Sequence, residues 1–151
     1  MQLKKEILIG TWRLVSSTRT ILDTGEVVNS YGGRPNGWIN YGGDGRMMVV
    51  VAHDGRPKLA DPLSLTDVEQ AALFKTFFAY AGTYDLEEGS IVHYIDTSWN
   101  ETWSGTQMKR NLVLSGQQVV YTTEPFAFSG DGRESVVTLV WEKYDLAAGE
   151  K

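Results

Sequence analysis

The chain has 151 residues, with 14 Lys and Arg against 19 Asp and Glu, so its formal net charge is −5. This length fits one ordinary domain, which we expect to span residues 1–151. The lack of cysteine excludes disulfides, thiolate metal sites and thiol nucleophiles, and the mild acidity without blocks of like charge disfavours nucleic acid and anionic membranes as partners.

The first residues carry too short an apolar run for a signal peptide. Ile7, Leu8 and Ile9 are the only consecutive apolar residues before Gly10, whereas a signal peptide has an apolar core of about 7–15 residues. No stretch approaches the run of about 20 apolar residues that a membrane-spanning helix needs. We therefore expect a cytoplasmic protein.

Most of the chain alternates polar and apolar residues with a period of two, which is typical of β-strands. Short turns rich in Gly, Asp and Asn separate these segments, as tight hairpins require. A meander of this length is expected to curl or close, because an open sheet exposes two edges. We predict strands over roughly 9–20, 26–31, 37–42, 46–53, 83–87, 90–97, 106–115, 117–124 and 134–144.

One segment between the fourth and fifth strands is predicted to be a helix, from Thr66 to about Tyr80. Thr66 and Glu69 have the spacing of a capping box, and apolar residues recur at helical spacing as far as Tyr80. Gly82 then ends the predicted helix. We expect this helix to cover one mouth of a barrel, either as a fixed plug or as a mobile gate.

Alternation also predicts which side chains face the interior. In the first strand Trp12 and Leu14 share one face while Arg13 and Arg19 share the other, so both arginines are expected to point outward. In the last strand the same rule places Trp141 inside.

Two polar residues fall on predicted interior faces, Arg110 and His93. A guanidinium stays charged inside a protein, so Arg110 needs a carboxylate, the face of an aromatic ring or an anionic ligand. Asp96, Glu101 and Glu124 are candidate structural partners. His93, with an ordinary pKa of about 6.5, is either a general acid or base or a hydrogen-bonded core residue.

Several short motifs also follow one another along the chain in a specific order. They are Gly10-Thr11-Trp12, Tyr31-Gly32 with Pro35-Asn36-Gly37, Tyr41 with Gly45-Arg46-Met47, Tyr80-Ala81-Gly82-Thr83-Tyr84, and then His93, Trp103 and Arg110. Together they resemble the bacterial and fungal lipocalin-like domain family over nearly the whole chain. The resemblance implies a closed or nearly closed antiparallel β-barrel of eight to ten strands. It also implies that Trp12 closes the base under a basic side chain near the end of the last strand, for which Lys143 is the candidate.

For function, the resemblance implies an interior pocket, and we expect the barrel to bind a small hydrophobic or aromatic molecule. The ligand-binding candidates are Trp38, Tyr41, Met48, Phe77, Tyr80, Trp99, Trp103 and Tyr121. The alternative is a cofactor-free enzyme of isomerase, cyclase, hydratase or lyase type. In that case the catalytic candidates are His93 as acid or base, Arg110 as anion clamp and Tyr84 as hydrogen-bond donor. A third hypothesis is a filled barrel with a structural or partner-binding role.

Motifs for nucleotide, metal or nucleophilic chemistry are missing from the sequence. It has no Walker loop, no dinucleotide-binding fingerprint, no His-Glu-x-x-His and no nucleophile elbow. We therefore expect no metal and no cofactor, and neither nucleic acid nor a membrane as partner. Exposed strand edges are compatible with a homodimer.

Overall fold

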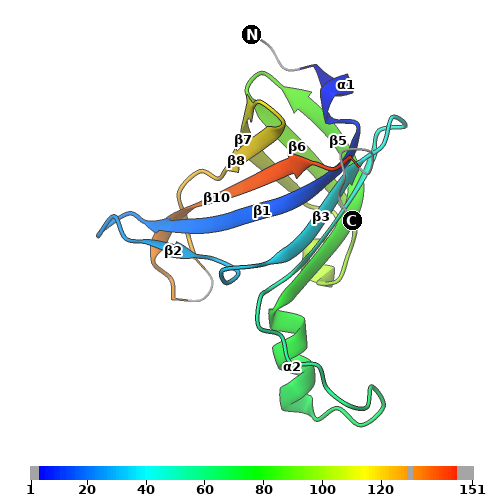
Figure 1. The fold of residues 1–151 in the computed structure, drawn as a ribbon, viewed down its shortest axis with the longest axis vertical. Helices are drawn as coiled ribbons and strands as arrows, with labels where there is room; N and C mark the ends of the chain where they lie inside the picture. The colour runs from blue at the N-terminus through cyan, green and yellow to red at the C-terminus, as the bar shows by residue number, and fades with distance from the viewer. Residues whose placement is uncertain (1–3, 129–130, 146–151) are drawn as a thin grey trace.

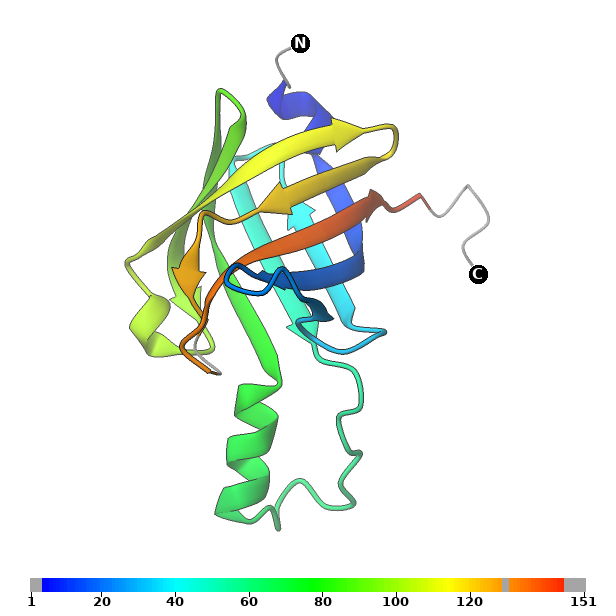
Figure 2. The same ribbon diagram turned by 90° about the vertical axis from the view of Figure 1, so that its left-hand side faces the viewer.

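The computed structural model describes residues 4–128 and 131–145. The described strands form one antiparallel sheet in the order β2-β1-β3-β4-β5-β6-β7-β8-β10-β9, and an additional pairing of β1 with β10 closes it into a barrel (Figures 1 and 2). Eight of these strands make the barrel, and β2 and β9 are short additions at its edge. This confirms the all-β, lipocalin-like barrel predicted from the sequence.

The strands are β1 (Gly10–Ile21), β2 (Val27–Asn29), β3 (Asn36–Tyr41), β4 (Arg46–Ala52), β5 (Phe77–Glu87), β6 (Ser90–Ser98), β7 (Gln107–Ser115), β8 (Gln118–Thr122), β9 (Phe126–Ala127) and β10 (Glu134–Lys143). The helices are α1 (Lys5–Leu8), α2 (Asp67–Lys75) and a 3-10 turn, η1 (Glu101–Trp103). No helix in these two described ranges has the length and apolar character needed to cross a membrane.

One end of the barrel is closed around Trp12, as the resemblance implied. The Trp12 ring is buried, and its Nε1 donates to the carbonyl of Leu8 at 2.8 Å. Lys143 lies over the ring, with Nζ 4.8 Å from the ring centroid, and donates to the carbonyl of Ile9. Gly10 permits this contact, because a Cβ there would lie 2.8 Å from the Lys143 ammonium.

The prediction that Arg19 points outward is wrong. Between Leu14 and Ser16 the register of β1 with β10 shifts, and this bulge exchanges the two faces for the rest of the strand. Arg19 is therefore buried, with a 2.5 Å ion pair to Asp131 and its guanidinium carbon 4.1 Å from the centroid of the Phe128 ring.

The helix in the middle of the chain begins where predicted and ends early. Thr66 and Glu69 form the expected capping box, each side chain bonding to the other's backbone N–H. The helix ends at Lys75, and residues 77–80 belong to β5, where they pair with β4. The helical spacing over these residues is outweighed by the sheet, which satisfies their backbone groups and places alternate rings inside.

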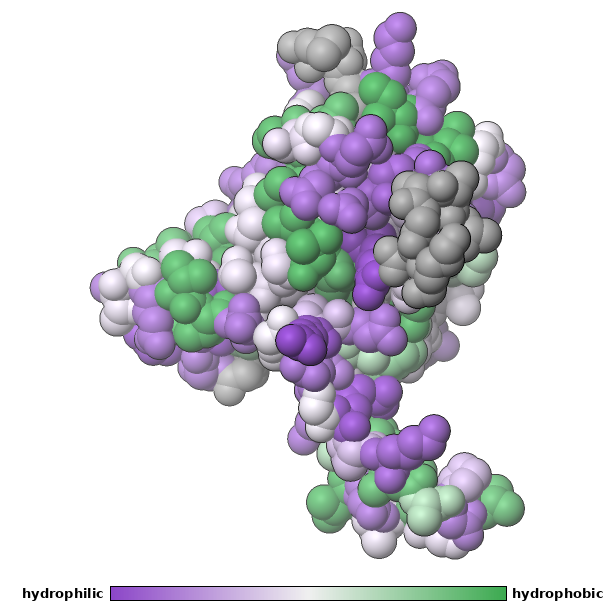
Figure 3. All heavy atoms as spheres, viewed as in Figure 1, coloured by the Kyte–Doolittle hydropathy of each residue, from purple (hydrophilic) through white to green (hydrophobic). Residues whose placement is uncertain are grey.

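Because its apolar continuation belongs to the sheet, α2 does not cover the barrel mouth. It projects away from the barrel, and none of its residues is buried (Figure 2). Hydrophilic and hydrophobic residues are mixed along this projecting segment (Figure 3). Its end is held at the rim by Arg56, which donates to the carbonyl of Leu73 and to Oγ1 of Thr76, and by Trp99, whose Nε1 donates to the carbonyl of Phe74.

Gly82 lies at a second bulge rather than at a helix end. The register of β5 with β6 shifts between Ala81 and Gly82. A Cβ on Gly82 would lie 1.8 Å from the carbonyl oxygen of Tyr94, which is far inside van der Waals contact. The two backbones approach this closely only because residue 82 has no side chain.

Replacing this glycine tests the bulge. Gly82→Ala is expected to lower the free energy of unfolding by about 3 kcal/mol, because the added methyl group must push two paired strands apart. Urea unfolding followed by tryptophan fluorescence measures the change. The control is Gly33→Ala, where the nearest atom to a new Cβ is 3.9 Å away and the change should stay within about 0.5 kcal/mol. Equal stabilities of the two variants would contradict the close approach.

Candidate functional site

The interior of the barrel contains a cavity of about 60 Å³. At roughly 30 Å³ for one water in the liquid, this space holds about two waters. Half-buried rings stand at its mouth: Phe78 lies 5.6 Å from Tyr31 and 6.3 Å from Trp103, measured between ring centroids. The cavity is lined by Tyr31, Ile39, Val49, Phe78, Tyr80, His93, Trp103, Met108, Arg110, Tyr121, Leu139 and Trp141.

A hydrogen-bonded chain of four side chains crosses the wall of this cavity. His93 on β6 is buried, with Nδ1 2.7 Å from the hydroxyl of Tyr80 on β5 and Nε2 2.7 Å from the hydroxyl of Tyr41 on β3. The Tyr41 hydroxyl lies 2.6 Å from that of Tyr121 on β8. We call these four residues the tyrosine–histidine chain. Four strands must pair in the correct register to assemble it.

The tyrosine–histidine chain is electrically neutral. Burial, and to a smaller extent the positive charge of Arg110, lower the pKa of His93 to about 3. Burial raises the pKa values of Tyr41, Tyr80 and Tyr121 above the ordinary phenol value. At neutral pH the chain therefore holds an uncharged imidazole and three protonated phenols.

Arg110 lines the cavity, as the alternation of β7 predicts. Its guanidinium donates to the carbonyl of Lys109 at 3.2 Å and contacts the sulfur of Met108 at 3.4 Å. Within residues 4–128 and 131–145 no ion pair involves Arg110. Glu101, one of its predicted partners, is exposed on η1.

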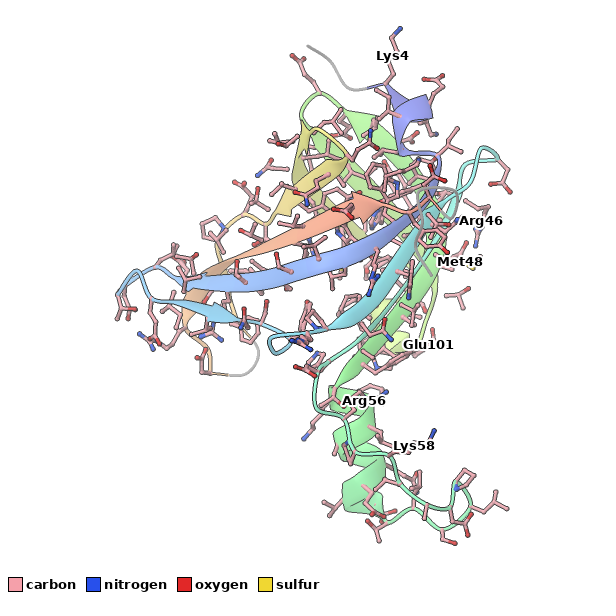
Figure 4. The ribbon with its side chains drawn as sticks, viewed as in Figure 1. Lys4, Arg46, Met48, Arg56, Lys58 and Glu101 are labelled. Carbon is pink, nitrogen blue, oxygen red and sulfur yellow. The ribbon has the colours of Figure 1, made fainter. Side chains whose placement is uncertain are left out.

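The other two predicted carboxylate partners are engaged elsewhere. Asp96 points outward and forms a 2.5 Å ion pair with Arg46, which also lies on the outer face of the barrel (Figure 4). Glu124 accepts from the side-chain amide of Asn111 at 2.7 Å. The interpretation of Arg110 as half of a structural ion pair therefore has no support in the described part of the chain.

A further polar group in the cavity wall lacks a partner. The indole Nε1 of Trp141 is buried and makes no hydrogen bond to any described residue. The Trp141 ring packs beside the Tyr121 ring, with 6.4 Å between the ring centroids. A buried N–H without an acceptor is destabilising by about 1–3 kcal/mol, which a bound acceptor would relieve.

Of the residues predicted from the sequence, five line the cavity and one lies in the layer behind it. The five are Tyr80, His93, Trp103, Arg110 and Tyr121. Tyr41 does not line the cavity, and it links His93 to Tyr121.

Three predicted ligand-binding residues face away from the cavity. Met48 is 62% exposed and points outward from β4 (Figure 4). Trp38 packs against Tyr144 on the outer face of β3, and Phe77 lies under the guanidinium of Arg56. Each is one residue away from a lining position, because side chains alternate along a strand. The lining positions are Ile39, Val49 and Phe78.

Two more predicted site residues lie near the cavity without lining it. Tyr84 is buried, but its hydroxyl donates to the carbonyl of Gly42 at 2.8 Å and its ring packs 4.7 Å from that of Tyr41. It therefore supports the tyrosine–histidine chain from behind and cannot donate to a ligand there. Trp99 stands at the rim, edge-on to Trp103 at 4.8 Å.

The site residues predicted from the sequence omitted seven lining residues, which are Tyr31, Ile39, Val49, Phe78, Met108, Leu139 and Trp141. Met108 shares the predicted interior face of Arg110, so alternation alone was enough to include it. Phe78 follows from alternation once β5 is known to begin at Phe77. Tyr31 lies in the loop after β2, and no local pattern marks it as a lining residue.

Comparison with known proteins found a matching family and similar solved structures. A family model described as a lipocalin-like domain matches residues 9–144. The crystal structure of an uncharacterized protein from Bacteroides eggerthii DSM 20697 is similar over 91% of this chain and 99% of its own, with 13% sequence identity and a TM-score of 0.44. A search of curated proteins found no match.

The buried neutral His93 makes stability depend on pH. Above its ordinary pKa of about 6.5 neither the folded nor the unfolded chain protonates this residue. Between about 6.5 and 3 only the unfolded chain binds the proton, so the free energy of unfolding should fall by about 1.4 kcal/mol per pH unit as the pH decreases. Urea unfolding at pH 7.5 and 5.5 measures this slope.

The matched variants are His93→Gln, which should lose this part of the slope, and His53→Gln, which should keep it because His53 lies outside the tyrosine–histidine chain. The pKa of His53 is also lowered, by partial burial and by Arg56, so its own smaller part is removed in that variant. An identical slope in wild type and His93→Gln would show that His93 is not held neutral by burial.

Proposed function

Because the chain belongs to the lipocalin-like domain family, we propose that it binds a small hydrophobic or aromatic molecule in the interior of its barrel. The aromatic lining supports this proposal, and α2 does not cover the mouth. A cavity that encloses a benzene ring in another protein measures about 150 Å³, so the 60 Å³ here accepts only a head group of a few atoms. The ring of the ligand then lies at the mouth, against Tyr31, Phe78 and Trp103.

The observation that carries the proposal is Arg110. Its guanidinium lines the cavity and is only half-buried, and the described residues supply no carboxylate partner, so it is available to bind an anion. An anionic or carbonyl oxygen on the ligand would complete its hydrogen bonds. Trp141, with its unpaired N–H in the same wall, favours an oxygen-bearing head group in the same way.

Binding can be tested before the ligand is identified. Native mass spectrometry of the freshly purified protein should show a bound small molecule, and aromatic carboxylates should raise the melting temperature, because a ligand that binds only the folded state stabilises it. Arg110→Met should weaken carboxylate binding about tenfold or more, as expected for loss of a charge-assisted hydrogen bond.

The control is Lys109→Met, since Lys109 is adjacent in sequence but faces outward in an ion pair with Glu87. This variant should bind as wild type does. If no compound of an aromatic carboxylate panel shifts the melting temperature and nothing co-purifies, the hypothesis of a filled structural barrel replaces this one.

The same cavity favours a second function, that of a cofactor-free enzyme of isomerase, cyclase, hydratase or lyase type. The specific observation is a continuous chain of an imidazole and three phenols beside the ligand space, an arrangement that can move protons. Both ring nitrogens of His93 are bonded to tyrosines, so the hydroxyls of Tyr80 and Tyr121 would contact the substrate. His93 would then act through them.

Catalysis is tested on the molecule that co-purifies. Incubation with catalytic amounts of the protein should convert it to an isomer, a hydrated product or a cleaved product, visible by NMR. His93→Gln should slow this conversion at least about tenfold while binding is retained. An unchanged spectrum with a bound molecule would leave binding as the function.

A further inference from the structure

The tyrosine–histidine chain has one more proton than it needs for its internal bonds. A neutral imidazole brings one N–H and three phenols bring three O–H groups, so four protons serve three links. Tyr41 is in the middle and its hydroxyl has no other partner among the described residues, so its proton is used within the chain. The spare proton therefore points out of one end, from Tyr80 or from Tyr121, and both ends line the cavity.

The tautomer of His93 decides which end donates. If Nε2 carries the proton, Tyr80 donates to Nδ1, Tyr41 donates to Tyr121, and the Tyr121 hydroxyl points into the cavity. If Nδ1 carries the proton, every bond is reversed and the Tyr80 hydroxyl points into the cavity. The chain thus offers a ligand one donor at one end and one acceptor at the other, never two donors.

Arg110 makes the two ends unequal. Burial raises the pKa values of Tyr31 and Tyr80, and the charge of Arg110 opposes that rise. The pKa of Tyr121 is raised by burial and by Tyr80 and lowered by its hydrogen bond with Tyr41, and Arg110 is not among these causes. Arg110 therefore acts at the Tyr80 end. Without a ligand, the cation disfavours a hydroxyl proton pointing toward it, which favours the Nε2–H tautomer. An anion placed between Arg110 and Tyr80 reverses this preference, and Tyr80 then donates to the anion.

With Tyr80 donating, the Tyr121 oxygen becomes an acceptor that needs a donor from the ligand. The Trp141 ring packs beside the Tyr121 ring, and its buried N–H has no acceptor among the described residues. A hydroxyl group is the simple group that satisfies both, because it donates one hydrogen bond and accepts others.

We propose that the head group is a hydroxy-carboxylate or hydroxy-enolate. Its anionic oxygen binds Arg110 and accepts from Tyr80, while its hydroxyl donates to Tyr121 and accepts from Trp141. This inference rests on the proposed binding function and specifies the ligand class for that site. If this ligand class is correct, the tautomer of His93 differs between the empty site and the occupied site.

The first experiment reads that tautomer from the ¹⁵N chemical shifts of the His93 ring. Tyr80→Phe leaves Nδ1 without a partner, and a buried lone pair is better tolerated there than a buried N–H, so Nε2–H is expected. Tyr121→Phe leaves Tyr41 without an acceptor, so Tyr41 should donate to Nε2 and the ring should carry its proton on Nδ1. Tyr94→Phe removes a hydroxyl from the exposed residue that follows His93 on β6, outside the cavity, and should leave the wild-type tautomer. The same tautomer in Tyr80→Phe and Tyr121→Phe would overturn the switching chain.

The second experiment uses mandelate and phenylacetate, which differ by one hydroxyl beside the carboxylate. Mandelate should bind wild type about tenfold more tightly, as expected for one added hydrogen bond, and should move the His93 proton to Nδ1. Tyr121→Phe should reduce the preference to about twofold or less, and Tyr94→Phe should keep it. Equal binding of the two probes to wild type would overturn the ligand class. Failure of every aromatic carboxylate to bind would instead overturn the binding function, and the tautomers of the variants would still decide the proton count.

Discussion

The pairing of β1 with β10 closes the sheet into a barrel with an enclosed interior. It runs from Trp12 opposite Lys143 to Ile21 opposite Ser135 and continues past the bulge in β1. Without it, water would reach the interior, and the imidazole of His93 would return toward its ordinary pKa. The neutral tyrosine–histidine chain and the isolated charge of Arg110 both follow from this closure, because only a low-dielectric interior makes hydrogen-bond partners decisive.

The barrel holds two arginines in its inner layer, and it treats them differently. Arg19 is paired with Asp131 and stacked on Phe128, so its charge is compensated within the protein. Arg110 has a sulfur and a carbonyl beside it and no carboxylate among the described residues. The fold thus supplies an anion where an arginine serves only structure. Arg110 has no such anion, and its charge faces the cavity. Beside it lies the neutral tyrosine–histidine chain, whose hydrogen bonds can run in either direction.

Regular strands could be interpreted from the sequence, and irregular ones could not. Alternation placed Trp12, Trp141 and His93 correctly because no bulge lies between them and the residues that fixed the pattern. It failed at Arg19, where a single shifted residue in β1 exchanged the faces, and at the start of β5, where pairing with β4 overrode helical spacing. The hydrogen-bond partners of His93 could not be predicted from the sequence, for another reason. Tyr41 lies 52 residues away, and the contact exists only once β3, β5 and β6 are in register.

The segment between β4 and β5 leaves and rejoins the barrel at one point. The backbone N–H of His53 donates to the carbonyl of Thr76 at 2.9 Å, which clamps the two ends of the excursion together. Because α2 within this segment buries no residue, the stability of the barrel should depend little on the length of the segment. Doubling the length of such a loop changes the free energy of loop closure by only about 0.6 kcal/mol. This is where evolution or an engineer can insert a whole additional domain beside the mouth while leaving the interior chemistry intact.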